Sequence, residues 1–238
     1  MIIDYEELKK LPKLVVISCT SWKKRIGNLT RVFDSLANNT YQPSVIFLNL
    51  SLSEFPDQEN DLPKELLEWD KIPIFLNWIP GPNTKTFKKL IPTVKILYRD
   101  YPHLPIITVD DDVIYEKDFV KKLIEKGNEN PEAIISNNMC RGCWMNQQCV
   151  NGAGTLYRSA FFNEFLWKGL VKQVIETNED DWWYSFVIWL FGSRQVLYVP
   201  TRMQFFNEIE GGQYKLQNTR EVLLNYWRWL INKKEVIK

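Results

Sequence analysis

Apolar and β-branched residues along the first half of the chain alternate between short continuous runs and helically spaced sets. The continuous runs predict buried strands, and sets spaced by three and four residues predict helices packed against them. Predicted strands cover 14–20, 44–51, 73–79 and 105–109, and predicted helices cover 28–39, 62–70, 84–101 and 117–127. Pro92 is expected to kink or reset the third helix, and Gly127 to close the fourth. This alternation predicts an α/β fold with a mainly parallel sheet flanked by helices.

The second half of the chain has a less regular pattern. A strand is predicted at 133–138. After an irregular segment, small residues at the start of 151–162 lead into a strand-like "TLY" and then a helix. Gly152 and Gly154 either permit close approach of the backbone to a ligand or mark a tight turn or bulge. The segment 176–192 begins with acidic residues and continues as a strongly apolar helix, and such a start is also typical of helix capping.

The least expected local pattern is "IITVDDDVIY" (106–115), in which a predicted buried strand runs directly into three aspartates. Asp110, Asp111 and Asp112 repel one another, and each loses hydration where the strand enters the core. One explanation is a turn whose aspartates cap the next helix and face water. The other explanation is a positively charged partner that neutralises the three carboxylates. Because ligands bind at the carboxyl ends of parallel strands, a divalent cation fits that position.

Composition narrows the function classes. The chain of 238 residues, with 45% hydrophobic and 25% charged residues, is long enough to bury a substantial core. Its formal net charge of +1 provides no general attraction for nucleic acid, so we expect no nucleic-acid partner. The glycine-rich phosphate motifs GxxxxGK[ST] and GxGxxG are absent from the sequence.

The cysteines and the N-terminus indicate a reducing compartment. Cys140 and Cys143 form a CxxC with Cys149 nearby, but the only histidine, His103, lies far upstream. Free thiols, Cys19 included, are therefore favoured over a zinc site. The first ten residues lack the apolar stretch of a signal peptide, and no apolar run approaches the roughly 20 residues of a membrane span. We expect a cytoplasmic protein.

The order of these motifs resembles that of the GT-A glycosyltransferases, in particular bacterial family 2-like enzymes that build surface polysaccharides. "SCTSWKKRI" (18–26) is similar to the family's first strand and base-binding loop, and "GPNTKTFKKLIPTV" (81–94) resembles its lysine-bearing segment. "TVDDDVIYEKDF" (108–119) matches the DxD stretch. "NGAGTLYR" (151–158) and "EDDWWYSF" (179–186) resemble the glycine-rich acceptor segment and the helix start that carries the catalytic base. The match covers roughly residues 14 to 200, in family order.

Two positions depart from the family pattern. Glu116 stands where related enzymes often have proline after the DxD turn, and the second predicted strand ends in Asn49 rather than in an acidic residue that contacts the base. The resemblance otherwise implies one GT-A domain over 1–238. Its parts are a nucleotide-sugar-binding half at about 14–130, an α+β acceptor-binding half at about 131–200 and a helical extension at 201–238.

The resemblance also implies a reaction. It is an inverting, metal-dependent transfer of a sugar from a nucleotide donor, UDP being favoured, to a saccharide or lipid-linked acceptor in surface polysaccharide synthesis. Asp112 and Asp110 would hold Mn²⁺ or Mg²⁺. Asp181 would be the catalytic base, with Asp180 as the alternative, if the helix buries Trp183, Phe186 and Leu190. The donor would contact Thr20, Trp22, Arg25, Asn49, Lys85, Asp110 and Asp111, and the acceptor side would include Gly152, Gly154 and Glu179.

Alternatives remain at this stage. A non-catalytic nucleotide-sugar-binding protein would also place carboxylates at this edge of the sheet. A sugar nucleotidyltransferase would as well, although it usually has a glycine-rich basic loop and this chain offers only Gly27 there. Lys88 and Lys89 are further cations near Lys85, but a helical lysine run is more often a solvated face. The C-terminal helix at 220–238 either packs onto the domain or, through its aromatic and basic residues at 220–234, contacts the inner face of the membrane peripherally.

Overall fold

The computed structural model describes residues 1–12, 15–137, 152–192, 195–206 and 219–232. Within them an eight-stranded sheet has the order β1-β4-β3-β2-β5-β8-β7-β9. Its strands in chain order are β1 (Ile2–Ile3), β2 (Val16–Thr20), β3 (Val45–Ser51), β4 (Ile74–Ile79), β5 (Pro105–Thr108), β7 (Ile134–Ser136), β8 (Thr155–Arg158) and β9 (Val196–Tyr198). β8 alone runs against its neighbours β5 and β7, and all other pairs in this sheet are parallel. The predicted mainly parallel α/β sheet is confirmed.

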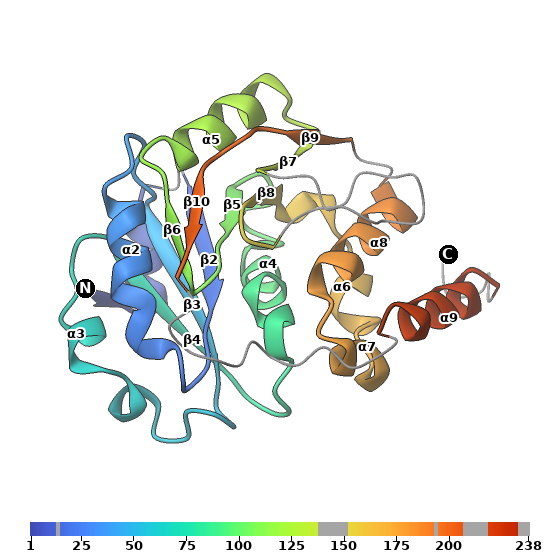
Figure 1. Ribbon diagram of the computed structural model, residues 1–238, viewed down its shortest axis with the longest axis horizontal. Coiled ribbons are helices and arrows are strands. Elements are labelled where there is room, and N and C mark those ends of the chain that lie inside the picture. Colours follow the sequence, from blue (N-terminus) through green and yellow to red (C-terminus); the bar gives the residue numbers. More distant parts are fainter. Residues whose placement is uncertain (13–14, 138–151, 193–194, 207–218, 233–238) are drawn as a thin grey trace.

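Helices cover both faces of this sheet (Figure 1). One face carries α2 (Leu29–Ala37), α3 (Lys64–Leu67) and α5 (Phe119–Glu129), and the other carries α1 (Tyr5–Lys10), α4 (Ile91–Leu97), α6 (Phe165–Lys168), α7 (Lys172–Thr177), α8 (Asp180–Gly192) and α9 (Thr219–Asn232). Successive strand residues point to opposite faces, so Ile46 and Leu48 join the first core and Phe47 joins the second. Strands buried on both faces explain the continuous apolar runs in the sequence.

Short 3₁₀ helices complete the connections: η1 (Ile26–Asn28), η2 (Gln58–Asp61), η3 (Lys85–Lys89) and η4 (Ser159–Phe161). The predicted helix at 84–101 is therefore divided into η3 and α4, with Pro92 in the first turn of α4. A proline is tolerated there because the first helical N–H groups have no partner within the helix. The helix predicted after the strand at 155–158 is limited to η4.

The predicted end of α5 at Gly127 is wrong. α5 continues to Glu129, and a Cβ at Gly127 would lie 3.2 Å from Leu156 of β8. This glycine therefore permits close packing of the helix on the sheet, which the local sequence pattern does not distinguish from a helix stop.

A second, two-stranded sheet pairs β6 (Val113–Tyr115) with β10 (Met203–Phe205) in antiparallel register. Phe205 lies opposite Val113, and the Phe206 amide donates to the Asp112 carbonyl at 3.0 Å. Sequence analysis predicted neither strand, nor β1 and β9, because each has three residues or fewer. Residues 203–206 follow the three aspartates by about ninety positions in the sequence. The pairing of β6 with β10 brings the two segments side by side.

The C-terminal helix α9 packs against α8 through aromatic rings. Trp227 is buried and stacks on Phe186 with ring centroids 4.5 Å apart, and it also lies 6.0 Å from Trp182. Trp229, in contrast, is 48% exposed. Packing onto the domain thus accounts for one side of the helix. Of the described helices, none combines the length and the apolar character that crossing a membrane requires.

Candidate active site

A cleft opens at the carboxyl ends of β2 and β5. Strands β2, β3 and β4 are added in one direction across the sheet, and β5 pairs with the other side of β2, so the strand order reverses between β2 and β5. Ligands of open α/β sheets bind at such a switch point. The cleft is lined by Thr20, Ser21, Trp22, Arg25, Lys85, Thr86, Lys88, Lys89, Asp110, Asp111, Asp112, Gly152, Asn178, Glu179, Asp180, Asp181 and Phe205.

The aspartate cluster (Asp110, Asp111 and Asp112) is bound to cations of the protein rather than to the next helix. Arg25 Nη1 lies 3.1 Å from Asp111 Oδ1 and 2.9 Å from Asp112 Oδ2, and Ser21 Oγ donates to Asp111 Oδ2 at 2.7 Å. Burial raises the pKa of Asp111, and burial together with the neighbouring Asp110 charge raises the pKa of Asp112, while Arg25 opposes both shifts. The explanation by helix capping is wrong, since Asp118 occupies the cap position of α5.

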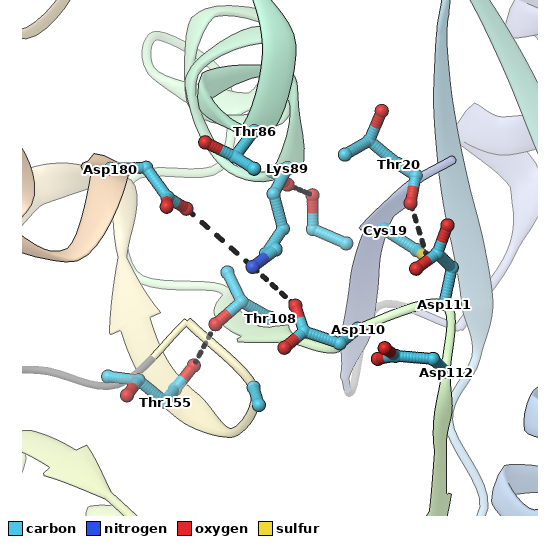
Figure 2. A network of polar contacts seen from close by, with 12 residues as sticks. Cys19, Thr20, Thr86, Lys89, Thr108, Asp110, Asp111, Asp112, Thr155 and Asp180 are labelled. Carbon is cyan, nitrogen blue, oxygen red and sulfur yellow. Dashed lines mark hydrogen bonds and ion pairs between the residues drawn. The ribbon is translucent and has the colours of Figure 1, made fainter. Parts of the chain in front are cut away.

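Lys89 connects the aspartate cluster with the start of α8 (Figure 2). Its ammonium group forms an ion pair with Asp110 Oδ1 and lies 3.6 Å from Asp180 Oδ2. The side chain is 7% exposed, and the carboxylates of Asp110, Asp180 and Asp181 outweigh burial and raise the pKa of Lys89. A buried lysine thus remains charged between carboxylates from two separate parts of the chain.

The acidic start of α8 contains carboxyl oxygens that lack hydrogen-bond partners among the described residues. Asp180 Oδ2 and Asp181 Oδ1 are both buried and without such a partner. Burial and the adjacent Asp180 raise the pKa of Asp181 well above its ordinary value, although the Gly152 amide donates to this carboxyl group and Lys89 opposes the shift. Such oxygens, next to a cleft, are positioned to accept hydrogen bonds or a proton from a ligand.

Gly152 leaves room for this arrangement. A Cβ at this position would lie 2.6 Å from both Asp181 Oδ1 and Lys89 Nζ, which is closer than real side chains approach. Gly152 is thus needed for close approach to the protein's own Asp181 and Lys89, and a close approach to a ligand stays a prediction. Gly154 is not among the residues that line the cleft, and a Cβ there would clash with the side chain of Asn137, which directly follows β7. Its small size therefore serves close packing within the protein.

Asn49 requires a correction. It is fully buried beneath the cleft, where its Nδ2 donates to Thr93 Oγ1 at 2.9 Å and its Oδ1 accepts from Asn77 Nδ2 at 2.7 Å. The side chain points to the α4 face of the sheet because of the alternation along β3. It lines no part of the cleft, so it is not placed to contact a nucleotide base.

The remaining predicted residues lie at the cleft. Thr20 Oγ1 donates to the Asn49 carbonyl at 2.7 Å, Trp22 is partly exposed with Lys24 Nζ 5.4 Å from its ring centroid, and Lys85 Nζ reaches the Glu176 carbonyl at 3.4 Å. Glu179 is buried beside Asp180. Of the cysteines, Cys19 is buried and free, while Cys140, Cys143 and Cys149 lie outside the described residues.

Sequence analysis ranks one contributor too low and misses another. It places Lys88 and Lys89 behind Lys85 as cations of a phosphate site, because a helical lysine run is more often a solvated face, but η3 is a 3₁₀ helix in which Lys88 and Lys89 are both buried. Tyr115 accepts from the Asp110 amide at 2.8 Å and donates to the Ala153 carbonyl at 3.0 Å, so it joins the aspartate cluster to the segment of Gly152. Its sequence signal, an apolar position in a short strand, does not distinguish this role from simple packing.

The chemistry of these oxygens suits a hard divalent cation that shares its coordination with a ligand. Among the described residues, no group of three or more histidine, cysteine, aspartate or glutamate side chains forms a metal cage. Mg²⁺, however, commonly uses one or two carboxylates together with substrate phosphates. Asp110 and Asp112 both line the cleft, and Arg25 contacts only Oδ2 of Asp112. The residues present therefore fit such a cation.

Comparisons with known proteins concern the fold. The structure of S. aureus TarS residues 1–349 in complex with UDP-GlcNAc matches with a TM-score of 0.56 and 14% sequence identity, over 94% of this chain and 68% of that one. The chain has the fold of glycosyltransferase structures. The complex of TarS 1–349 with UDP matches at a TM-score of 0.46 and 15% identity over 79% of this chain, and TarS itself at 0.48 and 14% over 90%.

The chain spans 59% and 43% of the length of these last two structures. No protein-family model and no curated protein sequence matches it.

Proposed function

We propose that this protein is a glycosyltransferase that transfers a sugar from a nucleotide donor. One observation carries the proposal: Lys89 joins the aspartate cluster at the end of β5 to the acidic start of α8 within a single cleft. The cleft lies at the switch point of a fold similar to glycosyltransferase structures. In this proposal the aspartate cluster serves the donor and the start of α8 accepts the proton, and sugar transfer requires these two roles to lie close together.

The donor is a nucleotide sugar, with UDP as the favoured nucleotide. Support comes from TarS, whose structures were determined with UDP and UDP-GlcNAc. In this proposal Trp22 and Thr20 face the base and ribose, since Thr20 ends β2, Trp22 follows it, and both line the cleft. Arg25 and Lys85 supply positive charge for the diphosphate. The sugar then extends toward the acidic start of α8, whose Asp180 and Asp181 line the same cleft.

A divalent cation, Mn²⁺ or Mg²⁺, would be held by Asp112 and Asp110 and would stabilise the negative charge that develops on the departing diphosphate. Asp111 does not take part in holding it, because both of its oxygens already have partners, Ser21 and Arg25. Its role is to hold Arg25 and the loop after β2 at the edge of the site.

The transfer proceeds with inversion. The acceptor hydroxyl oxygen forms a bond to the anomeric carbon, the bond from that carbon to the diphosphate oxygen breaks, and its electron pair leaves with the nucleotide. Asp181 takes the hydroxyl proton through Oδ1, the buried oxygen without a partner among the described residues. The raised pKa of Asp181 favours proton uptake, and Asp180 is the alternative base.

The acceptor is a saccharide or a lipid-linked saccharide of surface polysaccharide synthesis. A lipid-linked acceptor would place the enzyme at the inner face of the membrane, with α9 in peripheral contact. The exposed side of α9 supports this only weakly. Trp229 and Val222 are exposed there, but so are Glu221 and Asn225, and Trp227 is buried. Sedimentation with anionic liposomes tests this contact, and binding that is insensitive to salt or absent contradicts it.

Incubation with a panel of nucleotide sugars and Mn²⁺ tests the function. We expect slow hydrolysis of one UDP-sugar without acceptor, detected as released UDP and absent from the Asp181→Asn variant. Binding of a donor without turnover, even with candidate acceptors present, would instead indicate a non-catalytic binding protein. Cleavage that releases pyrophosphate from a nucleoside triphosphate would indicate a nucleotidyltransferase.

A further inference from the structure

Arg25 bridges two carboxylates through a single nitrogen. Nη1 contacts Asp111 Oδ1 at 3.1 Å and Asp112 Oδ2 at 2.9 Å. The three side chains are 16%, 10% and 14% exposed, so these contacts are poorly screened by water. Asp111 is also fixed by Ser21, whereas Oδ1 of Asp112 is not part of the bridge. Asp112 is therefore the partner that Arg25 can release more easily.

Cations of the protein partly neutralise the aspartate cluster. Arg25 pairs with Asp111 and Asp112, and Lys89 pairs with Asp110. Asp180 and Asp181 add further negative charge beside Lys89. A divalent cation arriving alone would compete with Arg25 for Asp112 and would be repelled by both nearby cations. We therefore expect weak cation binding in the absence of a second ligand.

A nucleoside diphosphate changes this balance. Its phosphate oxygens add negative charge beside the cluster, and a guanidinium group binds phosphate with the same fork of N–H donors that it presents to a carboxylate. Arg25 can then exchange Asp112 for the diphosphate without losing a charged partner. The oxygen that it releases becomes available to a divalent cation at the same moment.

We propose that Arg25 is the counter-ion of the aspartate cluster in the ligand-free protein. Arg25 releases Asp112 only when a nucleoside diphosphate binds, and Asp112 then binds a divalent cation. The proposal rests on the proposed function, because it assumes that the cleft accepts both ligands. Arg25 opposes cation binding to the ligand-free protein and supports nucleotide binding in the presence of the cation. Cation and nucleotide consequently bind as a pair.

Calorimetric titration of the full chain and its Arg25→Gln variant tests this exchange. We expect the variant to bind Mn²⁺ alone about 10–100-fold more tightly than the wild type, since one competing charged contact is gone. We expect it to bind UDP in saturating Mn²⁺ about 10–100-fold less tightly, since one phosphate partner is gone. A variant that merely misfolds would lose affinity in both titrations.

Lys23→Gln is the matched control. Lys23 lies on the same loop, is 61% exposed and pairs with Asp61 at 3.0 Å, away from the aspartate cluster. Its removal changes the net charge by the same amount, so we expect little shift in either titration. If Lys23→Gln tightens Mn²⁺ binding as much as Arg25→Gln does, a general charge effect replaces the exchange.

Other outcomes are equally decisive. Unchanged or weaker binding of Mn²⁺ alone by Arg25→Gln overturns the exchange, and so does equally tight binding of UDP to the wild type with and without Mn²⁺. If UDP binds tightly to the wild type under neither condition, the proposed function fails first, and the titration of Mn²⁺ alone then reports only on the aspartate cluster.

Discussion

Asp112 and Asp181 occupy opposite sides of the cleft and have different surroundings. Asp112 is paired with Arg25 through one oxygen, whereas Asp181 accepts from the Gly152 amide and has an oxygen without a partner among the described residues. A carboxylate that already has a cationic partner suits the binding of charge. One with a buried oxygen that accepts no hydrogen bond from the described residues suits the uptake of a proton. Separate substitutions should therefore separate donor binding from transfer.

Asp112→Asn should weaken the binding of UDP in the presence of Mn²⁺ by at least about 10-fold, because even outer-shell changes around a metal cost about 10–100-fold. Isothermal titration measures the effect. Asp118→Asn is the control, since Asp118 is exposed and accepts from Thr40 Oγ1 outside the cleft. Unchanged affinity in Asp112→Asn would exclude Asp112 as a cation ligand.

Asp181→Asn should lower the rate of sugar transfer by about 10²–10⁴-fold and leave the binding of UDP and Mn²⁺ intact, because an amide cannot accept the acceptor proton. The assay is kcat with the donor identified in the panel. Trp183 and Phe186 are buried and Leu190 is partly buried, so the condition for assigning Asp181 is met at two of its three positions. If Asp180→Asn loses activity and Asp181→Asn does not, the base is Asp180. If neither loses activity, the inverting mechanism is wrong.

At the scale of elements, the cleft depends on connections between segments that are distant in sequence. Tyr115 of β6 joins the Asp110 amide to the Ala153 carbonyl. Asn178 ends α7 in the left-handed region, with φ 55°, and accepts from Thr86 Oγ1 at 2.8 Å. The first connection joins the turn between β5 and β6, which contains the aspartates, to the segment of Gly152. The second joins η3 to the residues just before α8. Together they hold these segments around the cleft.

Tyr115→Phe should destabilise the protein by about 1–3 kcal/mol, because the buried Asp110 amide and Ala153 carbonyl both lose their partner. It should also weaken the binding of UDP with Mn²⁺, since Asp110 is no longer held. Thermal unfolding and calorimetric titration measure the two effects. Tyr226→Phe is matched, because its hydroxyl donates to the Gly169 carbonyl at 3.1 Å away from the cleft. Equal effects of both variants on UDP affinity would contradict a role of Tyr115 in the site.

At the scale of the whole molecule, the cleft is a source of instability in the ligand-free protein. The folded protein binds a proton at Asp181 more tightly than the unfolded chain does, because burial and Asp180 raise this pKa. The stabilising contribution of the protonated group is complete below the unfolded pKa, near 3.8, and is lost as pH rises through the folded pKa. Above the unfolded pKa this group therefore lowers the free energy of unfolding, compared with its contribution in acid.

Asp181→Asn should consequently raise the Tm of the ligand-free protein at pH 7–8 by about 2–4 °C for each kcal/mol recovered, and change it little near pH 4. Differential scanning calorimetry of both proteins across this range measures the difference. Other shifted groups, such as Asp111 and Asp112, are common to both proteins, so they cancel in the comparison. A Tm difference that does not depend on pH would contradict the assignment to Asp181.

Much of the fold could be predicted from the sequence, because its signals are local. β2, β3, β4 and β5 are continuous apolar runs, and α2 and α5 have helical spacing, so each is visible within about ten residues. The three aspartates at the end of β5 could be assigned to the cleft edge because chain direction alone places the carboxyl end of a parallel strand there. For the acidic start of α8 the local pattern allows helix capping as well, and its assignment to the site comes from the resemblance to the glycosyltransferases.

Tertiary structure decided which charges meet. Nothing local distinguishes Lys89 from Lys85, or Asn49 from a base contact. Their roles follow from the inward turn of η3 and from the side of β3 that faces α4. The bridge from Arg25 to Asp112 joins residues 87 positions apart, and β6 and β10 pair over a similar separation. Ion pairs and short strands that join remote segments produce no periodic pattern of apolar residues in the sequence. They form only after the sheet has brought the remote segments together.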